Sequence, residues 1–254
     1  MLACAAVLRG NAIGHAQTFG IIDNSFLVEE SFNQDMGTFQ NIVTWTRNDS
    51  RAWEASFTQE WPALVTRHQV SYSVPLASGD GASAHLGSVQ LNYRYQVMNE
   101  GARRPAFAPR VSLILPTGSH VDASDRPGFQ VNLPISKQRG NLYLHANLGL
   151  TWLHAVPIDV NRTASLTSPH VAASVVWNTR PLLNVLTETV VAFDDEGHGH
   201  ETTVTVSPGF RTGWNRGERQ IVVGAALPIT VDGDAAGVAV LTYFSYELPF
   251  SARR

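Results

Sequence analysis

The densest group of potential metal ligands in the sequence runs from residue 194 to residue 201. It holds two histidines and four carboxylates, in the order Asp194-Asp195-Glu196-Gly197-His198-Gly199-His200-Glu201. Imidazole and carboxylate groups suit zinc and other divalent ions. A hydrated acidic loop has the same composition and is the commoner case. The sequence therefore predicts an acidic loop here, with neither a metal nor a cofactor site.

A second group could support nucleophilic catalysis. His145 and Asn147 share one face of an alternating segment, and Ser112 and Ser136 are conceivable neighbours of that face. A serine nucleophile needs its base within about 3 Å, which spacing alone does not establish. An enzyme that acts on membrane lipid would carry these groups on its outer face, whereas His145 alternates inward. We therefore expect a protein without enzymatic activity, in which His145 forms hydrogen bonds in the interior.

Arginines and glutamates recur on the inward side of several segments. Buried charges must pair, and the planar guanidinium suits carboxylates. Two interpretations stay open: an ion-pair network that fills a narrow interior, or a constriction that selects solutes. The candidate residues are Glu30, Glu60, Arg94, Arg110, Glu188, Arg211 and Glu247.

Composition limits the class of protein that carries these residues. The chain has 254 residues, of which 15% are charged and 44% hydrophobic, with a net charge of −3. Globular domains average about 25% charged residues, yet no run of about 18 apolar residues suggests a membrane helix. The hydrophobic content excludes disorder, and a pI near 6.3 gives no reason to expect nucleic acid as a partner. A buried soluble β protein and a lipid-facing β-barrel remain.

Alternation of apolar and polar residues favours the barrel. Between residues 88 and 97, for example, Leu91 and Tyr93 alternate with Asn92 and Arg94. The sequence contains twelve such segments, and most are long enough for a tilted strand to cross a bilayer. Twelve is an even number of strands, as bacterial barrels require. The fold class is thus an all-β, transmembrane, antiparallel up-and-down β-barrel of about 12 strands within residues 38–250. The segments are 38–47, 52–61, 67–75, 85–97, 106–116, 128–137, 141–154, 168–178, 182–193, 201–212, 219–229 and 238–250.

The connections and the last strand support this interpretation. Connections at one end, such as 117–127 and 155–167, are about twice as long as those at the other, such as 138–140 and 179–181. This asymmetry is typical of outer loops and periplasmic turns. The last strand ends at Phe250 in an alternating apolar and aromatic pattern, which resembles the signal that the barrel-assembly machinery reads. We therefore expect that machinery and outer-membrane lipid as partners.

The amino terminus resembles an export signal. A short apolar core ends in Gly14-His15-Ala16, which predicts a signal peptide over residues 1–16, and the missing charged leader suggests that it is truncated. Cleavage would remove Cys4, the single cysteine. Residues 17–37 would then either fold into the lumen as a plug or form a periplasmic tail or short helix. In the lumen, Glu29 and Glu30 would meet Arg94, Arg110 or Arg211.

Several motifs together resemble the outer-membrane barrel family known by the MetA pathway of phenol degradation. The likeness spans about residues 20–250. The motifs are residues 23–30 (DNSFLVEE), 32–34 (FNQ), 57–61 (FTQEW), 92–96 (NYRYQ), 108–118 (APRVSLILPTG), 130–134 (QVNLP), 207–211 (SPGFR) and 247–250 (ELPF). The resemblance implies a transporter-like barrel for small hydrophobic compounds and brings no defined catalytic residues.

These observations predict a passive channel in the bacterial outer membrane for a small hydrophobic or aromatic solute. Two alternatives stay open at this point. One is an outer-membrane barrel that serves as a scaffold or an enzyme without transport, and the other is a soluble all-β binding protein.

Overall fold

Strands make up most of the part of the chain that the structure describes. The computed structural model describes residues 20–21, 25–79, 83–118, 125–217, 219–233 and 235–250, so the predicted signal peptide and Cys4 lie outside it. Within these residues, no helix has the length and apolar character needed to cross a membrane. The strands are β1 (Thr38–Asn48), β2 (Trp53–Ala63), β3 (Val65–Ser78), β4 (His85–Leu86), β5 (Val89–Tyr95), β6 (Ala106–Phe107), β7 (Arg110–Leu115), β8 (Gly128–Asn132), β9 (Ile135–Arg139), β10 (Leu142–Asp159), β11 (Arg162–Arg180), β12 (Leu183–Asp195), β13 (His200–Arg216), β14 (Arg219–Ala226), β15 (Ile229–Asp232) and β16 (Ala235–Pro249).

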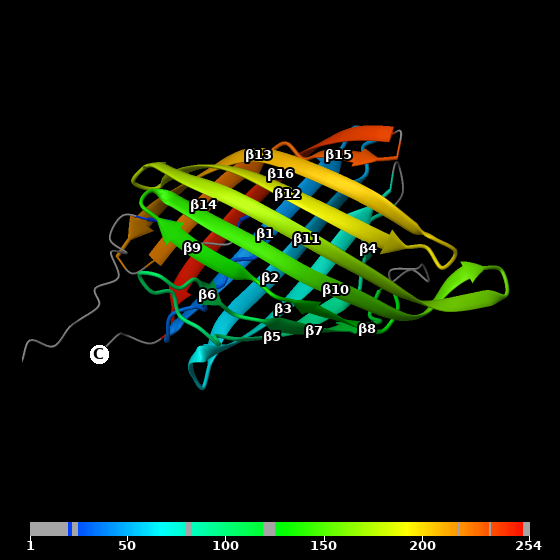
Figure 1. Cartoon of the computed structure of the whole chain (residues 1–254), viewed down its shortest axis with the longest axis horizontal. Helices are drawn as coiled ribbons and strands as arrows, with labels where there is room; N and C mark the ends of the chain where they lie inside the picture. The colour runs from blue at the N-terminus through cyan, green and yellow to red at the C-terminus, as the bar shows by residue number, and fades with distance from the viewer. Residues whose placement is uncertain are drawn as a thin grey trace, which may run out of the picture.

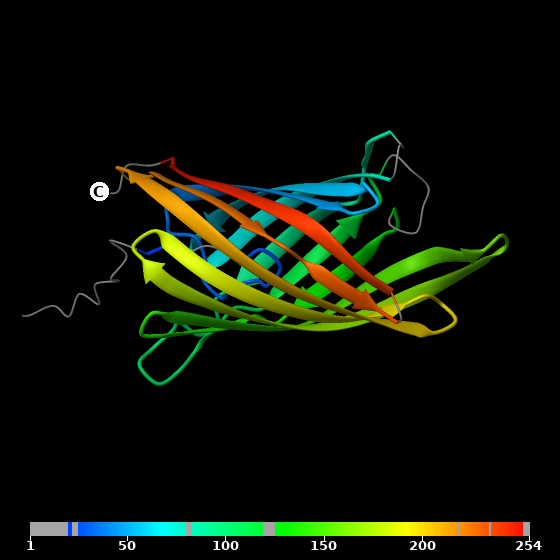
Figure 2. The same cartoon turned by 90° about the horizontal axis from the view of Figure 1, so that it is seen from above.

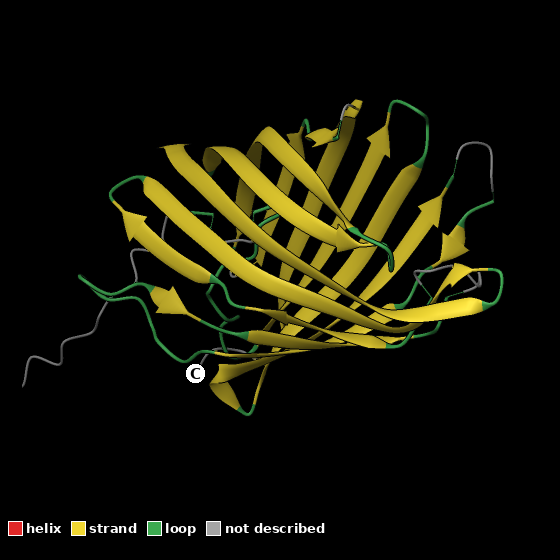
Figure 3. Cartoon of the chain, turned by 45° about the vertical axis from the view of Figure 1, so that its right-hand side comes forward, coloured by secondary structure: helices red, strands yellow, loops and turns green. Residues whose placement is uncertain are grey.

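These strands form a closed antiparallel barrel (Figures 1 and 3). Neighbours in the chain pair in turn, and β16 closes the wall by pairing along the whole of β1, from Thr38 opposite Pro249 to Asn48 opposite Ala239. The sixteen strands count as twelve barrel strands, because β4/β5, β6/β7, β8/β9 and β14/β15 are each one barrel strand with an interruption. The predicted all-β fold and its number of strands are confirmed.

Prolines cause three of these interruptions. Pro109 separates β6 from β7, Pro134 separates β8 from β9, and Pro228 separates β14 from β15. A proline has no N–H group to donate to the neighbouring strand, so the ladder of hydrogen bonds lapses at each of these positions. The wall nevertheless continues across them, because the carbonyl oxygen of Pro109 accepts from the amide of Tyr95 and that of Pro228 from the amide of Ala239.

The two faces of the wall have opposite chemistry. On β5, Leu91 and Tyr93 point outward with 46% and 43% exposed, whereas Asn92 and Arg94 point inward and are buried. An apolar outer face and a polar interior are the arrangement that a barrel in lipid requires. The low charge of the whole sequence therefore reflects the outer face, where single apolar residues alternate along each strand.

Both ends of the barrel chain lie at one rim. β1 begins and β16 ends there, and outward-facing Phe39 and Phe250 stack with 6.1 Å between ring centroids. We call this the terminal rim and the opposite one the distal rim. The short turns 140–141 and 181–182 lie at the terminal rim, and from their shortness and from the chain ends we expect this rim to be the periplasmic side. Recognition of β16 by the assembly machinery stays a prediction.

The prediction of a long distal loop over residues 155–167 is wrong. β10 continues to Asp159 and β11 begins at Arg162, so only residues 160–161 form the turn and the hairpin projects beyond its neighbours (Figure 1). Ala155 has a positive φ of 53°, and the register shifts between Leu153 and Val156. This bulge interrupts the alternation in the sequence, while the pairing resumes beyond it.

Candidate functional site

A segment without regular structure, residues 25–37, lies inside the barrel between its walls (Figure 2). We call it the luminal segment. Its backbone amides find partners among inward-facing side chains: Glu29 donates to Asn147 Oδ1 at 2.8 Å, Ser31 to Ser136 Oγ at 2.8 Å and Gln34 to Gln69 Oε1 at 2.7 Å. Buried backbone groups need such partners. The polar interior of the barrel therefore takes the place of a strand neighbour for this segment.

Glu188 of β12 holds the start of the luminal segment. Its carboxylate accepts the backbone amides of Phe26 at 3.2 Å, Leu27 at 2.8 Å and Val28 at 2.9 Å, and Glu188 itself is fully buried. Hydrogen bonds from successive amides stabilise a buried carboxylate. Beside them, the Oγ atoms of Ser25 and Ser174 lie 2.8 Å apart.

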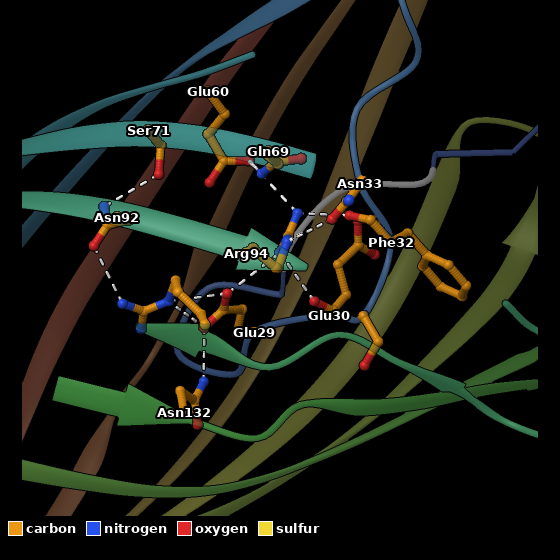
Figure 4. A network of polar contacts seen from close by, with 12 residues as sticks. Glu29, Glu30, Phe32, Asn33, Glu60, Gln69, Ser71, Asn92, Arg94 and Asn132 are labelled. Carbon is orange, nitrogen blue, oxygen red and sulfur yellow. Dashed lines mark hydrogen bonds and ion pairs between the residues drawn. The ribbon is translucent and has the colours of Figure 1, made fainter. Parts of the chain in front are cut away.

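Glu29 is the acid at the centre of the site (Figure 4). Its carboxylate accepts from Arg110 Nε at 2.8 Å, from Arg94 Nη1 at 3.3 Å and from Asn132 Nδ2 at 2.7 Å. Burial acts to raise the pKa of Glu29, but Arg110, Arg94 and these hydrogen bonds hold that pKa below its ordinary value of 4.5. Glu29 is therefore a paired anion at neutral pH.

Arg94 joins the luminal segment to the wall by its backbone. The guanidinium donates to the carbonyl oxygens of Glu30 at 3.1 Å and Phe32 at 2.6 Å, and to Asn33 Oδ1 at 3.0 Å (Figure 4). It also lies 4.0 Å from Glu60, whose carboxylate accepts from Gln69. With 3% of its surface exposed, Arg94 has little freedom to adopt another position.

Apolar packing holds the other side of the segment. Phe26 packs against a buried cluster that includes Ile21 of the chain before it and Tyr243 of β16. Gly224 of β14 makes room for the ring, because a Cβ added there would lie 2.4 Å from Cζ of Phe26. The remaining members of the cluster point inward from β1, β14 and β16, and they are Ile42, Val222, Ala226 and Leu241.

Two cavities border the luminal segment. The larger has a volume of about 360 Å³ and the smaller about 220 Å³, and Leu27, Glu29 and Arg110 line both. Four of the residues that line the larger cavity are apolar: Pro169, Ala172, Val190 and Ala192. Polar residues line it as well, among them Gln130, Asn132, Thr151, Ser168, His170 and Asp194.

Ser136 and His145, which the sequence suggested as neighbours, are in contact, and they help to hold the luminal segment in place. Ser136 Oγ lies 2.8 Å from His145 Nδ1, and the same hydroxyl accepts the amide of Ser31. Ser136 is fully buried and His145 is 4% exposed, and neither lines the two cavities described above. The pair thus holds the luminal segment.

The acidic residues 194–201 were expected to form a loop, but Asp194 and Asp195 end β12, His200 and Glu201 begin β13, and only residues 196–199 form the turn. Asp195 accepts the amides of Thr167 at 2.9 Å and Gly197 at 2.9 Å. Across the part of the chain that the structure describes, no group of three or more His, Cys, Asp or Glu residues is placed to hold a metal ion.

Comparisons with known proteins give the fold its context. No family model and no curated protein matches the chain. Among solved structures, the COG4313 outer membrane channel from Pseudomonas putida F1 matches with a TM-score of 0.67 at 11% identity, over 86% of this chain and 98% of that one. The NanC porin matches with a TM-score of 0.57 at 11% identity, over 82% of this chain and 100% of that one. The KdgM porin matches with a TM-score of 0.55 at 8% identity, over 82% of this chain and 98% of that one.

The chain has the fold of the bacterial outer-membrane channels and porins. At these identities the likeness establishes the fold alone. The proteins it resembles are channels and porins rather than enzymes. The narrower resemblance to the MetA-pathway family stays a prediction.

The structure brings most of the candidate residues to the luminal segment. Glu29 pairs with Arg110 and Arg94, and the carbonyl oxygen of Glu30 accepts from Arg94. Arg211 is 1% exposed and donates to Asn184 at 3.2 Å, and Glu247 lies on β16 opposite Gln40. Sequence reasoning missed Asn132 and Gln69, which are neutral and whose only signal was a polar residue at an inward position. It singled out Asn147 for catalysis, whereas Asn147 binds the backbone of Glu29.

Proposed function

We propose that this protein is a passive outer-membrane channel for small hydrophobic or aromatic solutes, and that residues 25–37 narrow its lumen. The observation that carries the proposal is the luminal segment itself, bonded to β3, β9, β10 and β12 across the interior. A scaffold needs no cavity beside such a segment, whereas a channel needs one. Two cavities, both lined by Leu27 and Glu29, lie beside this segment.

The lining of the larger cavity supports the solute class. A volume of about 360 Å³ lies within the range of small-molecule sites. Val190 and Pro169 offer an apolar side to a ring, while Thr151 and His170 offer hydrogen bonds to a polar substituent. Arg110 adds little net charge, because it is paired with Glu29. A single-ring solute with polar substituents can contact both kinds of lining residue at once.

Uptake into liposomes tests the proposal. The probes are 4-hydroxybenzoate and gluconate, two anions of equal charge of which only the first has a ring. We expect faster uptake of 4-hydroxybenzoate, and loss of that preference in Val190→Asn, which makes the apolar side polar. Thr205→Asn is the matched control, because Thr205 lines neither of the two cavities. Equal uptake of both probes would contradict the solute class, and uptake no faster than in protein-free liposomes would contradict transport.

A further inference from the structure

The two rims of the barrel differ in their exposed charges. At the distal rim, the exposed arginines Arg47 and Arg162 are mixed with exposed acids such as Asp159 and Glu196. At the terminal rim, Glu100 is partly buried and paired with Lys137 at 2.7 Å, and no described acid is fully exposed. The exposed residues of the terminal rim include Arg67, Arg103, Arg104, Arg139, Arg180, Arg216 and Arg219.

Two of these arginines face each other directly. Arg216 ends β13, Arg219 begins β14, and the two are opposite partners in the antiparallel ladder. Like charges directly opposite each other across two strands are destabilising. Glu218, which lies between them in the sequence, is outside the described residues. An anion held between the two guanidinium groups would turn the repulsion into attraction.

The pair lies on the lipid-facing side of the wall. Phe210 and Trp214 point outward from β13 with 51% and 55% exposed, and alternation places Arg216 on the same face. Arg219 shares that face because it is the direct partner of Arg216. Exposed tryptophans mark the level of the lipid headgroups. The guanidinium groups therefore lie where phosphate groups of the adjoining leaflet are found.

A second arginine repeats this arrangement. Arg139 of β9 is the partner of Leu142 on β10, and Leu142 is the partner of Trp177 on β11. Leu142 and Trp177 are outward-facing, with 39% and 54% exposed, so Arg139 lies on the lipid side at the level of Trp177, two strands away from it. An outward-facing arginine at the level of an exposed tryptophan thus occurs at two places on this rim.

We propose that Arg216 and Arg219 bind the phosphate of an anionic phospholipid in the leaflet that adjoins the terminal rim, with Arg139 as a second, weaker site. Arginine suits this role because its planar group binds phosphate oxygens through two parallel hydrogen bonds. The lipid is the partner, rather than an acidic protein, because the guanidinium groups stand on the lipid-facing side beside Trp214. This inference rests on the barrel wall and is independent of transport.

Lipid retention measures this binding. The folded barrel is purified in detergent, mixed with phosphatidylglycerol or with zwitterionic phosphatidylcholine, and its bound lipid is counted by native mass spectrometry. The test variant is Arg216→Gln/Arg219→Gln, and Arg47→Gln/Arg162→Gln at the distal rim is the control with the same change in charge. Heat-modifiable gel mobility shows that each variant is folded.

We expect the wild type and the distal control to retain phosphatidylglycerol over phosphatidylcholine. In the test variant, the ratio of retained phosphatidylglycerol to retained phosphatidylcholine should fall at least about fivefold. This is the change in affinity associated with one arginine at an anionic membrane surface. The preference should also fall with added salt. Equal retention of both lipids by the wild type, or an unchanged preference in the folded test variant, would overturn the proposal.

Discussion

The luminal segment touches two walls of opposite chemistry. On the wall of β1, β14 and β16, Phe26 packs into an apolar cluster with room provided by Gly224. On the wall of β5, β7 and β8, the carboxylate of Glu29 is held by Arg94, Arg110 and Asn132. One wall holds the segment by shape and the other by charge.

The apolar contacts of Phe26 and the ion pairs of Glu29 should therefore respond to different perturbations. Apolar packing depends on volume and is insensitive to pH and modest salt. A buried ion pair depends on both partners, because removal of one leaves the other charge unpaired. Variants on the two walls should therefore release the same segment under different conditions. Release is measured as single-channel conductance in planar bilayers and as chymotrypsin cleavage after Phe32.

The largest effect is expected on the charged wall. Glu29→Gln leaves the partly buried Arg110 without its carboxylate and leaves the buried Arg94 with only the more distant Glu60, at 4.0 Å. Removal of one partner from a buried ion pair costs about 3–5 kcal/mol. We expect higher conductance and rapid cleavage after Phe32. The control is Asp159→Asn, which removes one acid from the exposed distal hairpin. Unchanged conductance and protection in Glu29→Gln would show that the ion pairs do not hold the segment.

A smaller effect is expected on the apolar wall. In Gly224→Ala the new methyl group would overlap Phe26, and overpacking of this kind costs about 1–3 kcal/mol. Partial release of the segment should follow, with equal size at pH 7 and pH 5. Gly237→Ala on β16 is the matched control, since an added Cβ there meets nothing within 4 Å. Equal conductance and equal cleavage in the two variants would show that the packing of Phe26 does not hold the segment.

A comparable or smaller effect is expected for Ser136→Ala. The change removes two hydrogen bonds, one from the amide of Ser31 and one to His145, and each such bond contributes about 0.5–1.5 kcal/mol. Cleavage after Phe32 should become slightly faster, while conductance stays close to that of the wild type. A change in conductance as large as that of Glu29→Gln would make Ser136 a principal holding residue and would contradict this ranking.

Acidification should have no effect until the pH is low. The pKa of Glu29 is below 4.5 in the folded barrel, so its contribution is present above that value and is lost as the pH falls through the lowered pKa. The rise in conductance that depends on Glu29 should therefore occur only below pH 4.5. Glu29→Gln should lack this step. A rise between pH 7 and pH 5 would assign the holding charge to another group.

The sequence predicted the barrel wall well, because alternation with a period of two is a local property of each strand. It could not predict the bulge at Ala155, beyond which the hairpin continues in a new register. Within the site, Arg94 and Arg110 stood out as inward charges. The role of Glu188 did not, because its partners are backbone amides about 160 positions away in the chain, and every residue has such an amide.

The central claim is that the luminal segment controls passage through the barrel, and a reversible crosslink tests it most directly. The Oγ atoms of Ser25 and Ser174 are 2.8 Å apart, so Ser25→Cys/Ser174→Cys in a chain without Cys4 brings two thiols together. The account predicts that, in the Glu29→Gln variant whose segment is released, oxidation lowers 4-hydroxybenzoate uptake toward the wild-type rate and reduction raises it again. Equal uptake in the two states would contradict it.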